Sequence, residues 1–192
     1  MTKAKLHPTL LGLSGAMGDM VFRQRNGKTT VAIKPDTSNL EPSEAQIEHR
    51  DRFRDAVAYG KTVMADSDLR PLYEEVANER DVPLFAVTVA DFLNAPTIKD
   101  IDASMYNGQE DDLIKIKTAD DFGVLSVQVT LTNEAGNELI ETGSAVETGP
   151  NSGLWIYTAS EQVASGTNVI INAVATDRPG GVGVSSHFKL IA

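Results

Sequence analysis

The chain contains no cysteine among its 192 residues. This absence excludes disulfide bonds, thiolate metal sites and cysteine nucleophiles. Histidine is also scarce, because His7, His49 and His187 lie far apart and no pair has the spacing of metal ligands. Long apolar runs are missing as well: no stretch approaches the roughly 18 residues of a membrane span. The N-terminus also lacks the continuous run of about 7–15 apolar residues that a cleaved signal peptide needs.

Catalytic motifs occur only as short matches without the structural context that they need. Val31-Ala32-Ile33-Lys34, His49-Arg50-Asp51 and Asp121-Phe122-Gly123 match protein-kinase signatures. The His-Arg-Asp motif falls inside a predicted amphipathic helix, and the Asp-Phe-Gly motif falls in a turn between predicted strands. A kinase fold also needs a longer chain. No serine stands in a G-x-S-x-G elbow. We therefore predict that the protein is not an enzyme and has no small-molecule substrate.

Charge is present but unevenly placed, within a net charge of −10. Residues 1–34 carry six Lys or Arg against Asp19 alone, whereas residues 96–192 carry five against thirteen acidic residues. A basic segment of this kind can bind nucleic acid. It can equally bind the acidic second half of a neighbouring copy. We favour this hypothesis because the whole chain is acidic.

Local signals in the first half predict a hairpin followed by helices. Residues 19–34 predict a β-hairpin, because Asn26-Gly27 suits a two-residue turn. Ser43 and Gln46 form a capping box that begins a helix ending near residue 65. A second helix is expected over residues 69–80 with Asp68 as its cap. Residues 84–93 fit a helix or a strand, and we favour the helix.

The second half predicts a β-sandwich. After a boundary at residues 94–96, apolar residues alternate with polar ones in seven short segments. These predicted strands lie near residues 98–102, 113–118, 124–132, 138–142, 154–158, 168–176 and 182–190. The fold class is therefore α+β with two domains: an N-terminal β-hairpin plus helices, and a C-terminal all-β immunoglobulin-like sandwich. We divide the chain into a glycine-rich arm (1–18), a hairpin-plus-helices assembly module (19–95) and the sandwich (96–192).

Two loops of the predicted sandwich carry an acidic group. In an immunoglobulin-like fold the loops at residues 118–123 and 176–181 lie at the same pole, which brings Asp120, Asp121 and Asp177 together. One interpretation is a calcium site, since Ca²⁺ prefers several carboxylate and carbonyl oxygens. The other is a set of loop-capping aspartates with a salt bridge to Arg178. No other cofactor is expected.

Both halves of the chain resemble known bacterial families. Residues 119–124, 153–157 and 175–180 resemble bacterial Ig-like domains of surface and appendage proteins. The first half resembles an uncharacterised bacterial family with a glycine-spaced segment, a Gly-Lys hairpin and a helix of the form S-x-x-Q…R-x-R-F, here Gly12 to Gly18, Gly27-Lys28 and Ser43 to Phe53. The second resemblance implies no catalytic residues.

These observations favour a non-enzymatic structural subunit. We expect it to self-assemble, or to dock into an extracellular filament, appendage or virion-like assembly, with the Ig-like domain projecting outward. The expected assembly residues are Leu10, Leu11, Leu13, Arg23, Arg25, Lys28 and Lys34. Two alternatives stay open: a nucleic-acid-binding module that uses the basic hairpin, and a monomeric adhesion or carbohydrate-binding module. The expected location is extracellular or virion-associated without an evident cleavable signal peptide, with the cytoplasm as the other option.

Overall fold

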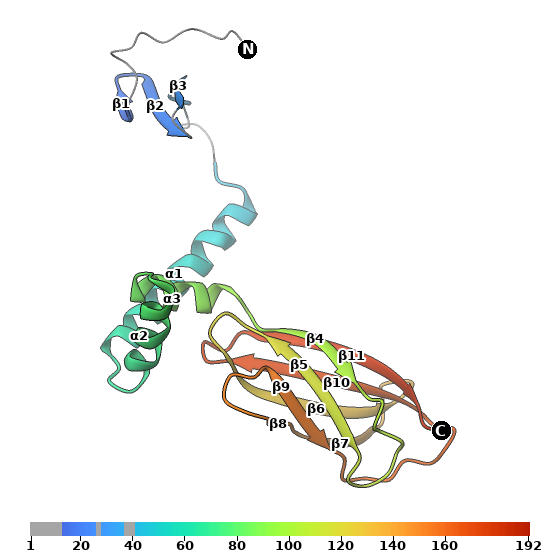
Figure 1. Ribbon diagram of the computed structural model, residues 1–192. Helices are drawn as coiled ribbons and strands as arrows, with labels where there is room; N and C mark the ends of the chain where they lie inside the picture. Colours follow the sequence, from blue (N-terminus) through green and yellow to red (C-terminus); the bar gives the residue numbers. More distant parts are fainter. Residues whose placement is uncertain (1–12, 26–27, 37–40) are drawn as a thin grey trace. The chain divides into compact units, whose positions relative to one another are not determined.

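The computed structural model describes residues 13–25, 28–36 and 41–192 (Figure 1). The chain divides into two compact units, residues 1–46 and 47–192. The predicted boundary at residues 94–96 falls inside the second unit, which contains the sandwich and the helical residues from position 47 onward. Leu10, Leu11 and the predicted turn at Asn26-Gly27 lie outside the described residues.

The first unit contains a three-stranded antiparallel sheet in the order β1-β2-β3. The predicted hairpin is confirmed by β2 (Met20–Arg25) and β3 (Lys28–Ile33), in which Phe22 pairs with Val31. A third strand, β1 (Gly15–Met17), was not predicted and pairs with β2. Gly18, at φ +60°, begins the turn that joins them, a conformation that glycine adopts readily. Residues 15–17 of the predicted arm therefore pair with the chain's own hairpin.

Three helices follow, and their ends show how the sequence specifies them. α1 (Glu44–Ala65) begins with the predicted capping box: the Gln46 amide donates to Ser43 Oγ at 3.4 Å, and the Ser43 amide donates to Gln46 Oε1 at 3.2 Å. α2 (Leu69–Arg80) is capped differently from the prediction, because Asp66 rather than Asp68 accepts the free amides. Residues 84–93 form a helix, α3 (Leu84–Leu93), as favoured.

The helices pack closely through small residues and buried aromatics. Val63 of α1 and Tyr73 of α2 are fully buried. Gly60 of α1 lies against α3, since a Cβ built there would stand 2.7 Å from Thr88 Oγ1. None of the helices in the described residues is long and apolar enough to cross a membrane.

The rest of the second unit is a β-sandwich of two four-stranded antiparallel sheets. One sheet has the order β4-β5-β9-β8, with bounds Thr97–Asp102, Leu113–Ala119, Leu154–Thr158 and Val146–Glu147. The other has the order β11-β10-β6-β7, with bounds Val182–Leu190, Asn168–Asp177, Val124–Asn133 and Leu139–Ser144. All seven predicted strands are present. The sequence missed β8, which has only two residues.

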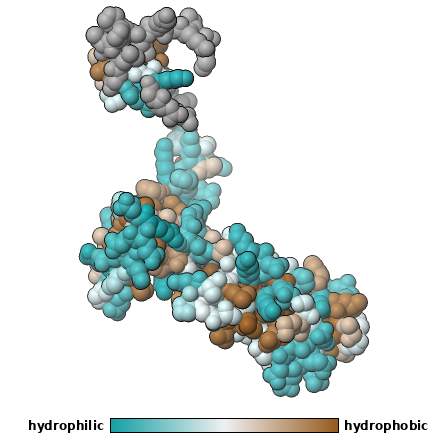
Figure 2. Space-filling view, in the orientation of Figure 1, coloured by the Kyte–Doolittle hydropathy of each residue, from teal (hydrophilic) through white to brown (hydrophobic). Residues whose placement is uncertain are grey.

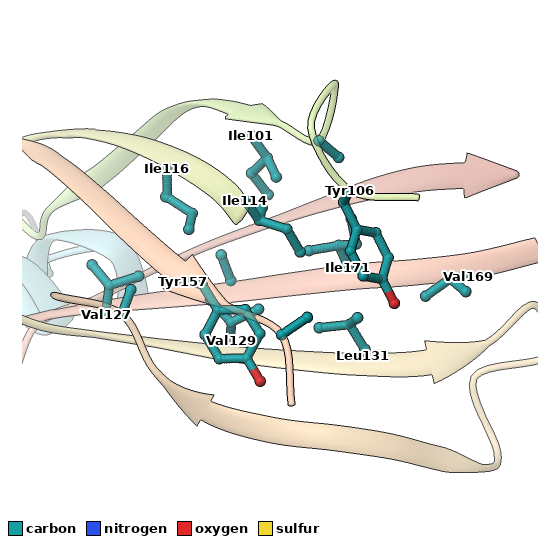
Figure 3. Packing of buried hydrophobic residues seen from close by; sticks show 14 of the residues in the cluster. Ile101, Tyr106, Ile114, Ile116, Val127, Val129, Leu131, Tyr157, Val169 and Ile171 are labelled. Atoms are coloured by element: carbon teal, nitrogen blue, oxygen red, sulfur yellow. The ribbon is translucent and has the colours of Figure 1, made fainter. Parts of the chain in front are cut away.

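The alternation of apolar residues produces the core between the two sheets. Ile114 and Ile116 of one sheet face Val129 and Ile171 of the other, and all four are fully buried (Figure 3). Tyr106, from the loop after β4, adds an aromatic ring to the same core. The sandwich therefore supplies a rigid support for the loops at its ends.

Candidate functional sites

Three aspartates from different elements meet where the helices join the sandwich. Asp91 lies in α3, Asp120 in the loop between β5 and β6, and Asp177 at the end of β10. One carboxylate oxygen of each lies within 4.8 Å of the other two. We call this group the carboxylate triad.

Each aspartate holds one oxygen in an internal hydrogen bond. The Tyr73 hydroxyl donates to Asp91 Oδ2. The amides of Phe122 and Gly123 donate to Asp120 Oδ2 at 3.0 and 2.7 Å. These bonds fix the orientation of the carboxylates.

Asp177 follows the same pattern. The Gly181 amide donates to Asp177 Oδ1 at 2.5 Å. The second oxygen of every triad member, namely Asp91 Oδ1, Asp120 Oδ1 and Asp177 Oδ2, is buried and has no hydrogen-bond partner among the described residues. Each of the three neighbouring carboxylates therefore has one buried oxygen without a partner among the described residues.

The triad is strongly shielded from water. Asp91 and Asp177 are each only 1% exposed, and Asp120 is half-buried. Burial raises the pKa of Asp91 to about 6, and burial also raises the pKa of Asp177. The proximity of Asp120 raises both values further. Such a cluster needs either a proton or a bound cation to balance its charge.

Aromatic residues surround the triad on the helix side. Tyr73 is fully buried, and its hydroxyl lies 2.7 Å from that of Tyr59. The ring of Phe122 stacks on Tyr73 with centroids 4.0 Å apart. The guanidinium of Arg178 lies over the Phe122 ring, with Cζ 5.3 Å from the ring centroid. Within the described residues Arg178 forms no ion pair, so the predicted salt bridge to it is absent.

The structure brings together Asp120 and Asp177 but not the predicted Asp121. Asp121 is exposed, and its Oδ2 accepts a hydrogen bond from Asn94 Nδ2 at 2.5 Å. Its backbone carbonyl accepts from Arg80. Sequence reasoning missed Asp91, although a signal existed: it is the only charged residue of the apolar helix α3.

The sheet of the first unit has one apolar face, which we call the N-terminal face. By strand register, Met17, Met20, Phe22, Val31 and Ile33 all project from the same side. Phe22 is buried, but the other four are exposed, and Ile33 is 79% exposed. A sheet face of this kind normally packs against another layer.

Two basic residues of the hairpin, Arg23 and Lys28, lie on the opposite side of this sheet. Arg23 and Lys28 are exposed there, and Arg25 pairs with Lys28 in the register. Lys34 follows β3, and its amide donates to the Asp19 carbonyl at 2.7 Å. Leu13 precedes β1 and is exposed. The described residues among those predicted for assembly therefore lie on or beside an amphipathic sheet.

A second apolar surface lies on β11, at the edge of the sandwich; we call it the β11 face. Val182, Val184, Phe188 and Leu190 project outward and are exposed, Phe188 to 71%. The inward positions of the same strand are small or polar, namely Gly183, Ser185, His187 and Lys189. The apolar side chains of β11 therefore point away from the core, and its small or polar side chains point toward it. Figure 2 also shows hydrophobic residues at the surface of the sandwich.

No protein-family model matches the chain, and no curated protein matches it. Among solved structures, it is similar to "The crystal structure of CopC from Methylosinus trichosporium OB3b". The two share 15% sequence identity over 48% of this chain and 89% of CopC, with a TM-score of 0.37. A likeness of this size supports no inference about function, so the arguments below use the chain's own residues.

Proposed function

We propose that the protein is a non-enzymatic structural subunit whose copies associate head to tail, the N-terminal face of one copy against the β11 face of the next. The observation that carries this proposal is the exposed apolar face of the sheet β1-β2-β3. Large exposed apolar patches on proteins mark interaction surfaces.

The described part of the first unit has very little buried apolar core, which supports the proposal. Among its described residues, only Phe22 is a buried apolar side chain. A three-stranded sheet gains stability by packing its apolar face against another layer. A neighbouring copy supplies such a layer.

The β11 face provides the matching surface. Its four exposed apolar side chains are not used by the sandwich core, because they point outward from the sheet. Two different apolar surfaces on one chain favour a heterologous contact, which continues into a ring or a filament. The charge distribution agrees, since residues 1–34 are basic and the sandwich is acidic.

Single charged substitutions test this proposal. Ile33→Glu places a charge on the N-terminal face, and Phe188→Glu places one on the β11 face. We expect the wild type to form large assemblies in mass photometry and negative-stain microscopy, and each substitution to abolish them. Val146→Glu is the matched control, because Val146 is 72% exposed but lies on β8, which belongs to neither face. Assembly that survives Ile33→Glu would contradict the proposal.

Mixing the two variants gives a sharper test. Ile33→Glu retains an intact β11 face, and Phe188→Glu retains an intact N-terminal face. A head-to-tail contact predicts that the mixture forms 1:1 dimers and nothing larger. If each face instead binds its own kind, each variant alone forms dimers, and the head-to-tail model is wrong.

The strand order supports the further proposal that the sandwich is Ig-like. Its sheets β4-β5-β9-β8 and β11-β10-β6-β7 correspond to the immunoglobulin orders A-B-E-D and G-F-C, with one added strand beside C. We propose that this domain projects from an extracellular filament, appendage or virion-like assembly. A salt-sensitive mobility shift with DNA, lost on Arg23→Ala, would favour the nucleic-acid alternative instead.

A further inference from the structure

We propose that the carboxylate triad binds a calcium ion, which ties helix α3 to a loop and a strand end of the sandwich. The ligands from this chain are Asp91 Oδ1, Asp120 Oδ1 and Asp177 Oδ2. This proposal is independent of the head-to-tail assembly.

The orientation of the carboxylates carries the inference. Each aspartate uses its other oxygen in a hydrogen bond to a tyrosine hydroxyl or a backbone amide. The three remaining oxygens are buried and have no hydrogen-bond partner among the described residues, and one carboxylate oxygen of each residue lies within 4.8 Å of the other two. Buried polar atoms in native proteins almost always have a partner, so unpartnered oxygens on three neighbouring carboxylates indicate a ligand.

The charge of the site indicates a cation. Asp91 and Asp177 are each 1% exposed, and within the described residues no lysine, arginine or histidine forms an ion pair with the triad. The nearby Arg178 is directed at the Phe122 ring. Carboxylates that gather away from water need a positive partner.

The spacing of the triad oxygens accommodates calcium. Calcium binds oxygen at about 2.3–2.6 Å, so two ligands on opposite sides lie about 4.6–5.2 Å apart. The triad oxygens lie within 4.8 Å of one another, which this sphere accommodates. Magnesium prefers shorter bonds of about 2.0–2.1 Å and usually keeps several waters.

Thermal unfolding of the full chain tests the site. After EDTA treatment, saturating CaCl₂ should raise the Tm by about 5 °C or more. Asp120→Asn and Asp177→Asn should lose most of this rise. Asp121→Asn is the matched control, because Asp121 is adjacent in the loop but lies outside the triad. It should respond to calcium as the wild type does.

Terbium provides a readout that needs no variant. Tb³⁺ occupies calcium sites, and its emission is sensitised by a nearby tyrosine; here Tyr73 donates directly to Asp91. We expect sensitised emission that calcium displaces. A Tm unchanged by calcium, with Asp177→Asn more stable than wild type, would overturn the proposal in favour of a shared proton. An equal Tm rise with MgCl₂ would overturn the assignment to calcium.

Discussion

At the scale of single residues, Gly181 shapes the carboxylate triad. Its amide holds Asp177 Oδ1, and a Cβ added to it would lie 2.4 Å from Asp177 Oδ2. It would also lie 3.2 Å from the Cα of Ala95. The site therefore depends on the absence of a side chain at this position.

We predict that Gly181→Ala destabilises the protein by about 1–3 kcal/mol, because Asp177 must move to accommodate the methyl group. The displaced carboxylate should also weaken the response to calcium. Urea unfolding with and without CaCl₂ measures both effects. Gly149→Ala is the control, since a Cβ there meets nothing within 4 Å; its stability should change by less than about 0.5 kcal/mol. Wild-type stability in Gly181→Ala would contradict this account.

Two of the three triad residues could be predicted from sequence. The loops that hold Asp120 and Asp177 are recognisable from their position between alternating strands. The sequence also predicts Asp121, which lies outside the triad. Adjacent loop residues point in different directions, and spacing alone does not reveal which of them faces the site. Asp91 lies 29 positions before Asp120 in the sequence, and only the docking of α3 on the sandwich brings them together.

At the scale of elements, a hydrogen-bonded chain joins the helices to the triad. Tyr59 of α1 contacts Tyr73 of α2, and Tyr73 donates to Asp91 of α3. Burial raises the pKa of both tyrosines, so their hydroxyls stay protonated and able to donate. Removing the central hydroxyl should therefore disturb all three helices.

We predict that Tyr73→Phe lowers the free energy of unfolding by about 1–3 kcal/mol, because it leaves Asp91 Oδ2 buried without its donor. The ring, and hence the stacking on Phe122, is retained. Tyr59→Phe removes only the outer hydroxyl and should cost less than about 1 kcal/mol. Urea unfolding of the three proteins in EDTA tests the order. Equal losses in the two variants would show that the hydroxyl at Asp91 has no special role.

Most elements could be predicted because their patterns are local. The capping box of Ser43 and Gln46 fixed the start of α1, and the two-residue periodicity fixed the long strands. β1 and β8 were missed because strands of three and two residues carry no periodicity. The reversed pattern of β11 was also missed: alternation identifies a strand, but it does not tell which face meets the core.

At the scale of the whole molecule, the two units differ in how their apolar residues are used. The second unit contains both clusters of buried apolar residues, one in the sandwich and one among the helices. We therefore expect its stability not to depend on the first unit. The first unit instead exposes most of the apolar side chains of its sheet.

We predict that a chain of residues 41–192 folds cooperatively and stays monomeric at concentrations where the full chain assembles. Starting at residue 41 retains the Ser43 capping box of α1 while removing the sheet β1-β2-β3. Light scattering and circular dichroism, compared with those of the full chain, check both expectations. The shortened chain should still gain thermal stability from calcium, because all three triad residues remain. Assembly of residues 41–192 would show that the N-terminal face is dispensable, whereas a lost calcium response in a folded monomer would count against the triad alone. The two proposals can thus fail separately.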